Sequence, residues 1–191
     1  MTTKFLLLLG PSGVGKTTII KKLREMDTHF VYISPYITRK LRASEADKVY
    51  VSNKKLDKLV ADGKILVVNH LYGIRYATPK ERIERAFKRN EFPLLDWPID
   101  RLDVMQEHFP GRLFRVYVRP PSLKVLRERL EEDSRDTDQT RLKAGTDELK
   151  RLKRGEYDHL IDYRVTNPTS SSEAVAEKIY KRYLSAIGED C

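Results

Sequence analysis

One stretch near the N-terminus decides how this chain folds: Gly10-Pro11-Ser12-Gly13-Val14-Gly15-Lys16-Thr17. It fits the pattern G-x-x-x-x-G-K-[S/T], in which glycines let the backbone curl until several N–H groups point inward at an anion. A helix is expected at residues 16–26, and its N-terminus would direct a positive dipole end at the same point. The stretch therefore predicts a phosphate-binding loop. Lys16 would contact the β- and γ-phosphates of a nucleotide, and the Thr17 hydroxyl would be positioned for Mg²⁺.

Segments with the patterns of strands and helices alternate around this loop. Residues 4–9 form a continuous apolar run, as expected for a parallel strand that is buried on both faces. Thr78 and Glu81 have the spacing of a capping box at the start of a helix. The expected strands are 31–33, 65–68, 92–95, 114–118 and 163–165, and the further helices are 53–62, 79–89, 101–109, 120–130 and one capped by Ser170 near the C-terminus. This alternation predicts a three-layer α/β fold, a parallel sheet of about five strands with helices on both faces.

The composition excludes several classes of protein. The 191 residues include 37 Lys and Arg against 28 Asp and Glu, a formal net charge of +9, and 40% are hydrophobic. Such a chain is too apolar to be disordered and too charged to be a membrane protein. The early apolar run is also too short for a membrane span or a signal peptide. The sole cysteine, Cys191, allows no intramolecular disulfide, so a reducing cytoplasmic compartment is expected.

An acidic residue follows the apolar run at 92–95. Because the carboxyl end of a parallel strand faces the ligand crevice in folds of this kind, Asp96 is the candidate carboxylate for Mg²⁺. Asp100 is the alternative, although its position favours the N-cap of the next helix. The four histidines are dispersed and have no cysteine partners, so no other metal site is expected.

Motifs farther along the chain resemble those of the guanylate kinase family. They occur in the family's order and, with the loop, cover about residues 4 to 180. They are Thr38-Arg39 with Arg42-Ala43-Ser44-Glu45 (family T-T-R-x-x-R-x-G-E), Gly73-Ile74-Arg75-Tyr76-Ala77-Thr78 (G-x-Y-Y-G-[S/T]), Pro120-Pro121-Ser122 with Leu126, Arg129 and Leu130 (P-P-S…L-x-x-R-L), Arg141-Leu142 (R-L) and Val165-Thr166-Asn167 (V-x-N).

The resemblance implies a kinase of one domain that uses ATP and Mg²⁺ and, in the family, transfers the γ-phosphate to GMP. Its core would comprise 1–33, 91–130 and 157–191, with an acceptor-binding insertion at 34–90 and a lid at 131–156. The high charge and thin apolar stripe of 131–156 separately predict a protruding, mobile helical segment. The loop with Thr18 and Asn167 would bind ATP, and Arg135 and Arg141 would join Lys16 in catalysis. The phosphorylated acceptor would be bound by Ser34, Arg39, Arg42, Lys48, Tyr76 and Thr78. Guanidinium forks suit phosphate because they bind it bidentately and stay charged.

Two positions that read guanine in the family differ in this chain. The family's Glu before its G-x-Y-Y-G motif is replaced by Val67, and the second acid of its L-D-x-D strand end is replaced by Pro98. A site without these acceptors would lose much of its selectivity for guanine. Glu45, Asp47 and Asp100 are the acids that could take over the reading.

The acceptor therefore stays open at this point. A nucleoside monophosphate is the first choice, and ribose 1,5-bisphosphate is the alternative, because a relative that phosphorylates it lacks guanine readers and carries a Tyr-Ile-Thr-Arg string like that at 36–39. Lys48, at the position of a phosphate-binding Tyr of the family, would suit a phosphate-rich acceptor.

Two readings from other classes also remain. A nucleic-acid-binding ATPase is allowed by the charge, but no RNA- or DNA-binding motif is visible and the tyrosines are scattered. A non-catalytic protein-binding module of the same family would tend to lose the phosphate loop, which is intact here. The chain is expected to act as a monomer or homodimer, with a small-molecule acceptor and no membrane partner.

Overall fold

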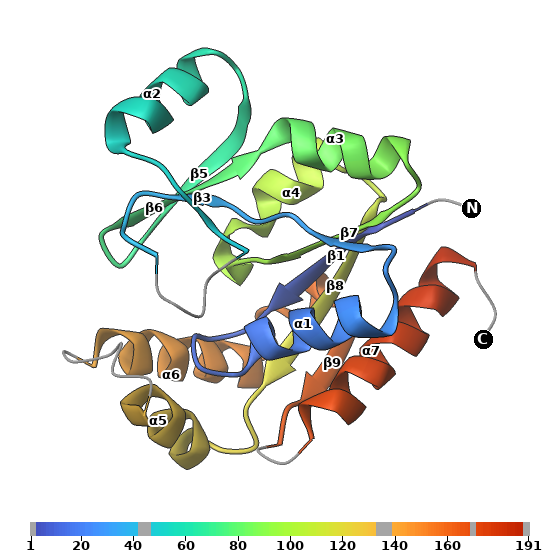
Figure 1. Cartoon of the computed structure of the whole chain (residues 1–191). Coiled ribbons are helices and arrows are strands. Elements are labelled where there is room, and N and C mark those ends of the chain that lie inside the picture. The colour runs from blue at the N-terminus through green and yellow to red at the C-terminus, as the bar shows by residue number, and fades with distance from the viewer. Residues whose placement is uncertain (1–2, 42–46, 133–138, 169–170, 189–191) are drawn as a thin grey trace.

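The computed structural model describes residues 3–41, 47–132, 139–168 and 171–188. Its main sheet has five strands in the spatial order β2-β7-β1-β8-β9, and all neighbours in it are parallel. From one edge to the other they are Phe30–Tyr32 (β2), Phe92–Asp96 (β7), Phe5–Leu9 (β1), Leu113–Arg119 (β8) and Tyr163–Thr166 (β9). The predicted α/β fold is confirmed, with β1 at the centre of the sheet (Figure 1).

The central strand β1 is buried on both of its faces. All five of its side chains are 0% exposed. Because successive side chains of a strand point to opposite faces, Leu6 and Leu8 pack into one hydrophobic cluster while Phe5, Leu7 and Leu9 pack into another. Two apolar layers therefore meet on this strand, which explains its continuous apolar sequence.

Helices cover the two faces of the main sheet (Figure 1). The helices α1 (Lys16–Met26) and α7 (Ser172–Ile187) bury side chains in the cluster of Leu6 and Leu8. The other cluster is covered by α3 (Lys80–Lys88) and α4 (Leu102–His108). The remaining core and lid elements are α5 (Leu123–Glu132), α6 (Thr140–Lys153) and the 3-10 turns η1 (Ile99–Arg101) and η2 (Asp158–Leu160). No described helix combines the length and the apolar character that a membrane crossing needs.

A second, smaller sheet stands apart from the first in the upper part of Figure 1. Its order is β4-β3-β6-β5, with bounds Val49–Tyr50, Tyr36–Ile37, Ile74–Pro79 and Ile65–Leu71. The helix α2 (Asn53–Ala61) packs on it through Leu56 and has the predicted N-cap, since the Ser52 hydroxyl accepts a hydrogen bond from the Lys55 N–H at 3.2 Å. Of these four strands, the sequence pattern predicted the one at 65–68. It missed β3 and β4, which are only two residues long, and β6, whose last two residues it assigned to the start of a helix.

The capping box predicted at Thr78 is wrong. Thr78 lies opposite Val67 in the pairing of β6 with β5, and Pro79 ends the same strand with extended backbone angles. The helix α3 begins at Lys80 without a side-chain cap. Pairing with β5 holds these two residues extended, and this tertiary contact overrides the local helix signal.

The described part of the predicted lid packs on the core. Gly145 of α6 is buried, and a Cβ atom there would lie 2.9 Å from the Pro11 side chain of the phosphate loop. Leu142 and Leu149 pack against the hydrophobic clusters of the main sheet. The expectation of a protruding helix is therefore wrong for α6, because its thin apolar stripe and its glycine allow close packing. Ser170, the predicted cap of α7, lies outside the described residues.

We predict that Leu8→Ala lowers the free energy of unfolding by about 3 kcal/mol, because it leaves a cavity between fully buried neighbours in the central strand. Val60→Ala on α2, where the side chain is 44% exposed, should change it by about 0.5 kcal/mol or less. Chemical denaturation of both variants measures the difference. Equal losses in the two variants would contradict the assigned centre of the core.

Candidate functional site

The phosphate loop is held in a shape that excludes side chains at two of its glycines. A Cβ atom at Gly10 would lie 2.2 Å from the carbonyl oxygen of Val118, and one at Gly15 would lie 2.4 Å from the Asn167 amide nitrogen. Both glycines also have positive φ angles, 120° and 91°. Larger residues would therefore displace the loop from the ends of β1 and β8.

Lys16 folds back over this loop. Its Nζ donates to the carbonyl oxygens of Gly10 at 2.5 Å and Pro11 at 2.9 Å. It is the first residue of α1, and Gly15 before it is the N-cap. The helix N-terminus, the loop N–H groups and the lysine thus meet at one place, as the sequence predicts, and such a place attracts an anion.

Asn167 braces the loop from behind. Its side-chain amide donates to the Val14 carbonyl oxygen at 2.7 Å, and its backbone carbonyl accepts from the Arg129 guanidinium at 3.1 Å. The side chain is 2% exposed, and neither Asn167 nor Val14 lines the cavity described next. The structure therefore connects Asn167 to the loop backbone.

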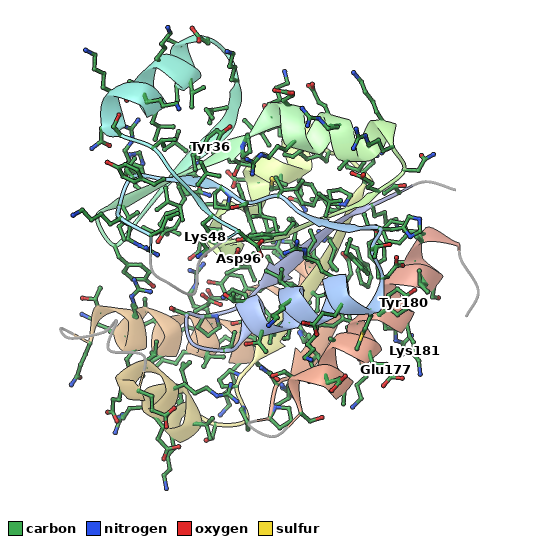
Figure 2. The ribbon with its side chains drawn as sticks, viewed as in Figure 1. Tyr36, Lys48, Asp96, Glu177, Tyr180 and Lys181 are labelled. Atoms are coloured by element: carbon green, nitrogen blue, oxygen red, sulfur yellow. The ribbon has the colours of Figure 1, made fainter. Side chains whose placement is uncertain are left out.

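A cavity of about 870 Å³ opens in front of the loop, between the main sheet, the small sheet and α6. Among the described residues that line it, seven are Lys or Arg and five are Asp or Glu. Its walls include the predicted site residues Gly10, Pro11, Ser12, Gly13, Gly15, Lys16, Thr17, Thr18, Arg39, Lys48, Tyr76, Thr78, Asp96 and Arg141. Segments that are distant in the sequence thus converge on one space, and two of the residues that line it, Lys48 and Asp96, are labelled in Figure 2.

Among the described residues, three predicted site residues do not line this cavity: Val14, Asn167 and Ser34. Arg42 and Arg135 lie outside the described residues. Ser34 is 2% exposed, its carbonyl oxygen accepts from Arg82 at 3.3 Å, and its hydroxyl has no hydrogen-bond partner among the described residues.

Asp96 lies at the carboxyl end of β7, beside Leu8 of the central strand. The Tyr32 hydroxyl donates to its Oδ1 at 3.1 Å, which orients the carboxylate at the cavity wall. Thr17 lines the same cavity from the start of α1. These two oxygen-bearing side chains have the hard donor atoms that Mg²⁺ prefers.

Asp100 is not the helix cap that the sequence predicted. It accepts hydrogen bonds from Arg151 at 2.8 Å and from the Tyr157 hydroxyl at 3.0 Å, and α4 begins two residues later, after Arg101. Because the Asp100 carboxylate accepts these hydrogen bonds from the lid and from the residue before η2, it does not cap α4. Asp47, another predicted guanine reader, accepts from Arg24 of α1 at 2.7 Å and lies outside the cavity lining.

Arg141 links three parts of the molecule. Its Nη1 donates to the Ser12 hydroxyl of the loop at 3.2 Å, and its guanidinium stacks over the Tyr72 ring at 4.4 Å. Tyr72 belongs to the turn between β5 and β6, so α6 contacts both the loop and the small sheet. Sequence reasoning missed Tyr72; the one signal for it was the aromatic residue before Gly73 in a tight turn.

A carboxyl group of α6 lies close to the loop lysine and was also missed. Burial raises the pKa of Glu148, although the hydrogen bond from Tyr117, at 2.7 Å, and the charge of Lys16 act in the opposite direction. Burial and the neighbouring carboxylate likewise raise the pKa of the Tyr117 hydroxyl far above its ordinary value. The hydroxyl therefore stays a hydrogen-bond donor that holds Glu148 in place.

Together these features define the class: a parallel sheet with a phosphate loop at the end of its central strand is the architecture of P-loop proteins that bind nucleoside triphosphates. A sequence model described as guanylate kinase matches residues 2–176 of the chain. The chain therefore belongs to the guanylate kinase family and is an ATP-using phosphotransferase with small-molecule substrates.

Individual proteins show the same likeness. The chain is 32% identical to a guanylate kinase of Clostridioides difficile over 82% of this chain and 78% of that one, and 29% identical to one of Oceanobacillus iheyensis over 95% and 93%. The crystal structure of guanylate kinase from Anaplasma phagocytophilum superimposes with a TM-score of 0.75 at 22% identity, over 96% of this chain and 86% of that one. A shikimate kinase from Acinetobacter baumannii gives a TM-score of 0.52. These two structures support the fold.

We predict a pH-dependent gain in stability for Glu148→Gln. Because the pKa of Glu148 is higher in the folded chain than its ordinary value of 4.5, the folded state binds more protons than the unfolded state at pH values above 4.5. The free energy of unfolding of the wild type therefore falls as the pH rises through this range. The glutamine variant lacks this loss, so its free energy of unfolding relative to wild type should increase as the pH rises above about 4.5.

Denaturation at several pH values measures this difference. Tyr117→Phe is the companion variant: it removes the hydrogen bond that favours the carboxylate, so its stability should fall more steeply with pH than that of wild type. Parallel pH profiles for wild type and Glu148→Gln would refute the assignment of a raised pKa.

Proposed function

We propose that this protein transfers the γ-phosphoryl group of ATP to the phosphate of a nucleoside monophosphate. One observation carries the proposal: a single cavity joins the phosphate loop and Lys16 to Arg39 and Lys48 of the insertion at 34–90. Two separate positively charged groups, facing one space, suit a donor and an acceptor that both carry phosphate. GMP is the first acceptor to test, because the relatives carry the name guanylate kinase.

Phosphoryl transfer requires positioning and charge neutralisation more than a protein nucleophile. In our proposal the loop N–H groups and Lys16 hold the β- and γ-phosphates of ATP, while Arg39 and Lys48 hold the acceptor phosphate. Arg141, which contacts Ser12 of the loop and Tyr72 of the small sheet, neutralises the charge on the transferred phosphoryl group. Asn167 acts through the loop that it braces.

Five further residues keep the roles that the sequence analysis gave them. Thr18 lines the donor end of the cavity, and Tyr76 and Thr78 line its wall in the small sheet. Arg42 and Arg135 would add guanidinium groups to the acceptor phosphate and the transferred group.

The residues present also fit a magnesium ion. Thr17 and Asp96 would hold it, with water completing the coordination, and when bound the ion would supply charge neutralisation between the phosphates. The hydrogen bond from Tyr32 orients the Asp96 carboxylate at the cavity wall, where it could hold the ion.

We predict that Lys16→Ala lowers kcat/KM by at least about a hundredfold, because a positioned charge on the transferred group is lost. The matched control is Lys21→Ala on α1, whose side chain is 76% exposed and should leave the rate unchanged. A coupled assay of ADP release measures both, and circular dichroism checks that the fold is kept. Wild-type rates in Lys16→Ala would remove the mechanism.

Arg39→Ala should raise the acceptor KM by about 30- to 1000-fold, with a much smaller change in the KM for ATP, because a charge-assisted contact with one phosphate is lost. Arg85→Ala on the exposed face of α3 serves as the control. Initial rates with each substrate varied in turn separate the two constants. A change confined to the KM for ATP would show that the insertion does not bind the acceptor.

Ribose 1,5-bisphosphate remains the second candidate acceptor. It is favoured by the position of Val67, which packs against an apolar cluster of the core and offers no acceptor to guanine, and by the positive charge of Lys48. A screen of ADP release with GMP, AMP, CMP, UMP and ribose 1,5-bisphosphate distinguishes the acceptors directly.

A further inference from the structure

The small sheet presents a buried amide to the cavity. Asn69 of β5 is 5% exposed and lines the cavity wall. Its Oδ1 atom accepts no hydrogen bond from any described residue. Because a buried acceptor without a partner is costly, such groups are rare unless a ligand or water completes them.

The strand pairing places this amide on the acceptor side of the sheet. Asn69 lies opposite Tyr76, and Val67 lies opposite Thr78. Directly opposed residues of an antiparallel pair project from the same face, and residues two apart on one strand share that face. All four side chains therefore belong to one face, and three of them line the cavity.

The chemistry of this face differs from that of the rest of the cavity. Among the described lining residues, the carboxylates come from β7, η1, α5 and α6, and none comes from the small sheet. The face thus offers hydroxyl groups and one amide, which presents one acceptor oxygen beside two donor hydrogens. Guanine needs two acceptors for its N1–H and 2-amino groups, so this amide can satisfy only one of them.

We propose that Asn69 reads the base of the acceptor nucleotide through one donor–acceptor pair. An amide matches a base edge on which an exocyclic amino donor stands next to a ring-nitrogen acceptor, as in adenine and cytosine. The preferred acceptors are then AMP or CMP, with GMP accepted less well. The inference deepens the proposed function and rests on it, because it assumes a nucleoside monophosphate in this cavity.

The test is a competition assay with AMP, CMP and GMP at equal concentrations. Wild type should use AMP or CMP at least as well as GMP. Asn69→Leu should lower kcat/KM for the preferred nucleotide by about 5- to 150-fold, the range expected for one bidentate base contact, with the KM for ATP nearly unchanged. Asn69→Asp supplies two acceptors and should raise the preference for GMP over AMP at least tenfold.

Asn90→Asp is the matched control, since it makes the same chemical change at an exposed site after α3 and should leave the selectivity as in wild type. A second measurement needs no variant. In the wild-type protein, the side-chain amide resonance of Asn69 should shift on addition of the preferred nucleotide and should not shift with ribose 5-phosphate.

The outcomes separate the two proposals. If wild type phosphorylates none of the nucleotides, the proposed function fails and the reading by Asn69 fails with it. If wild type phosphorylates them but the Asn69 variants keep its selectivity, or its amide resonance does not respond, the proposed function stands and the reading by Asn69 is overturned. Near-exclusive use of GMP by wild type would overturn it as well.

Discussion

The close approach of the phosphate loop to its neighbours is the constraint on which the rest of the site depends. Gly10 meets the backbone of Val118, and Gly15 meets the amide of Asn167, at distances that leave no room for a Cβ atom. The first contact requires β1 and β8 to lie side by side in register, with Leu9 opposite Tyr117, and the second requires β9, which ends just before Asn167, to pair with β8. Burial of β1 between two apolar layers holds that register, so the core determines where the loop N–H groups point.

The loop is also the point at which the other parts of the molecule meet. Arg141 of α6 contacts Ser12 of the loop and Tyr72 of the small sheet, and Gly145 lets the same helix pack against Pro11. The cavity is enclosed by the segments that these contacts bring together. The described lining of the cavity has more Lys and Arg than Asp and Glu, as the whole chain does. This positive charge favours ligands that carry phosphate.

Local patterns were reliable where one segment carries the whole signal. The loop, the helix that follows it and the buried strand before it have the predicted bounds to within a residue, because glycine spacing and apolar runs act over a few neighbours. The hydroxyl of Ser52 caps its helix as predicted. Thr78 carries a local signal of the same kind, yet strand pairing with Val67 overrides it. The two-residue strands β3 and β4 form by pairing with partners elsewhere in the sheet and have no pattern of their own.

The sequence by itself determined the phosphate loop, the α/β alternation, the family and the end of β7 that carries Asp96, because each depends on residues that are near in the chain. The tertiary structure alone decided which side chains share the cavity. Asp100 accepts hydrogen bonds from Arg151 and Tyr157, Glu148 accepts one from Tyr117, and Asn69 lines the cavity wall. These positions depend on contacts between elements that are distant in the sequence. The burial and hydrogen bonding of such groups follow from packing, which no local pattern of residues records.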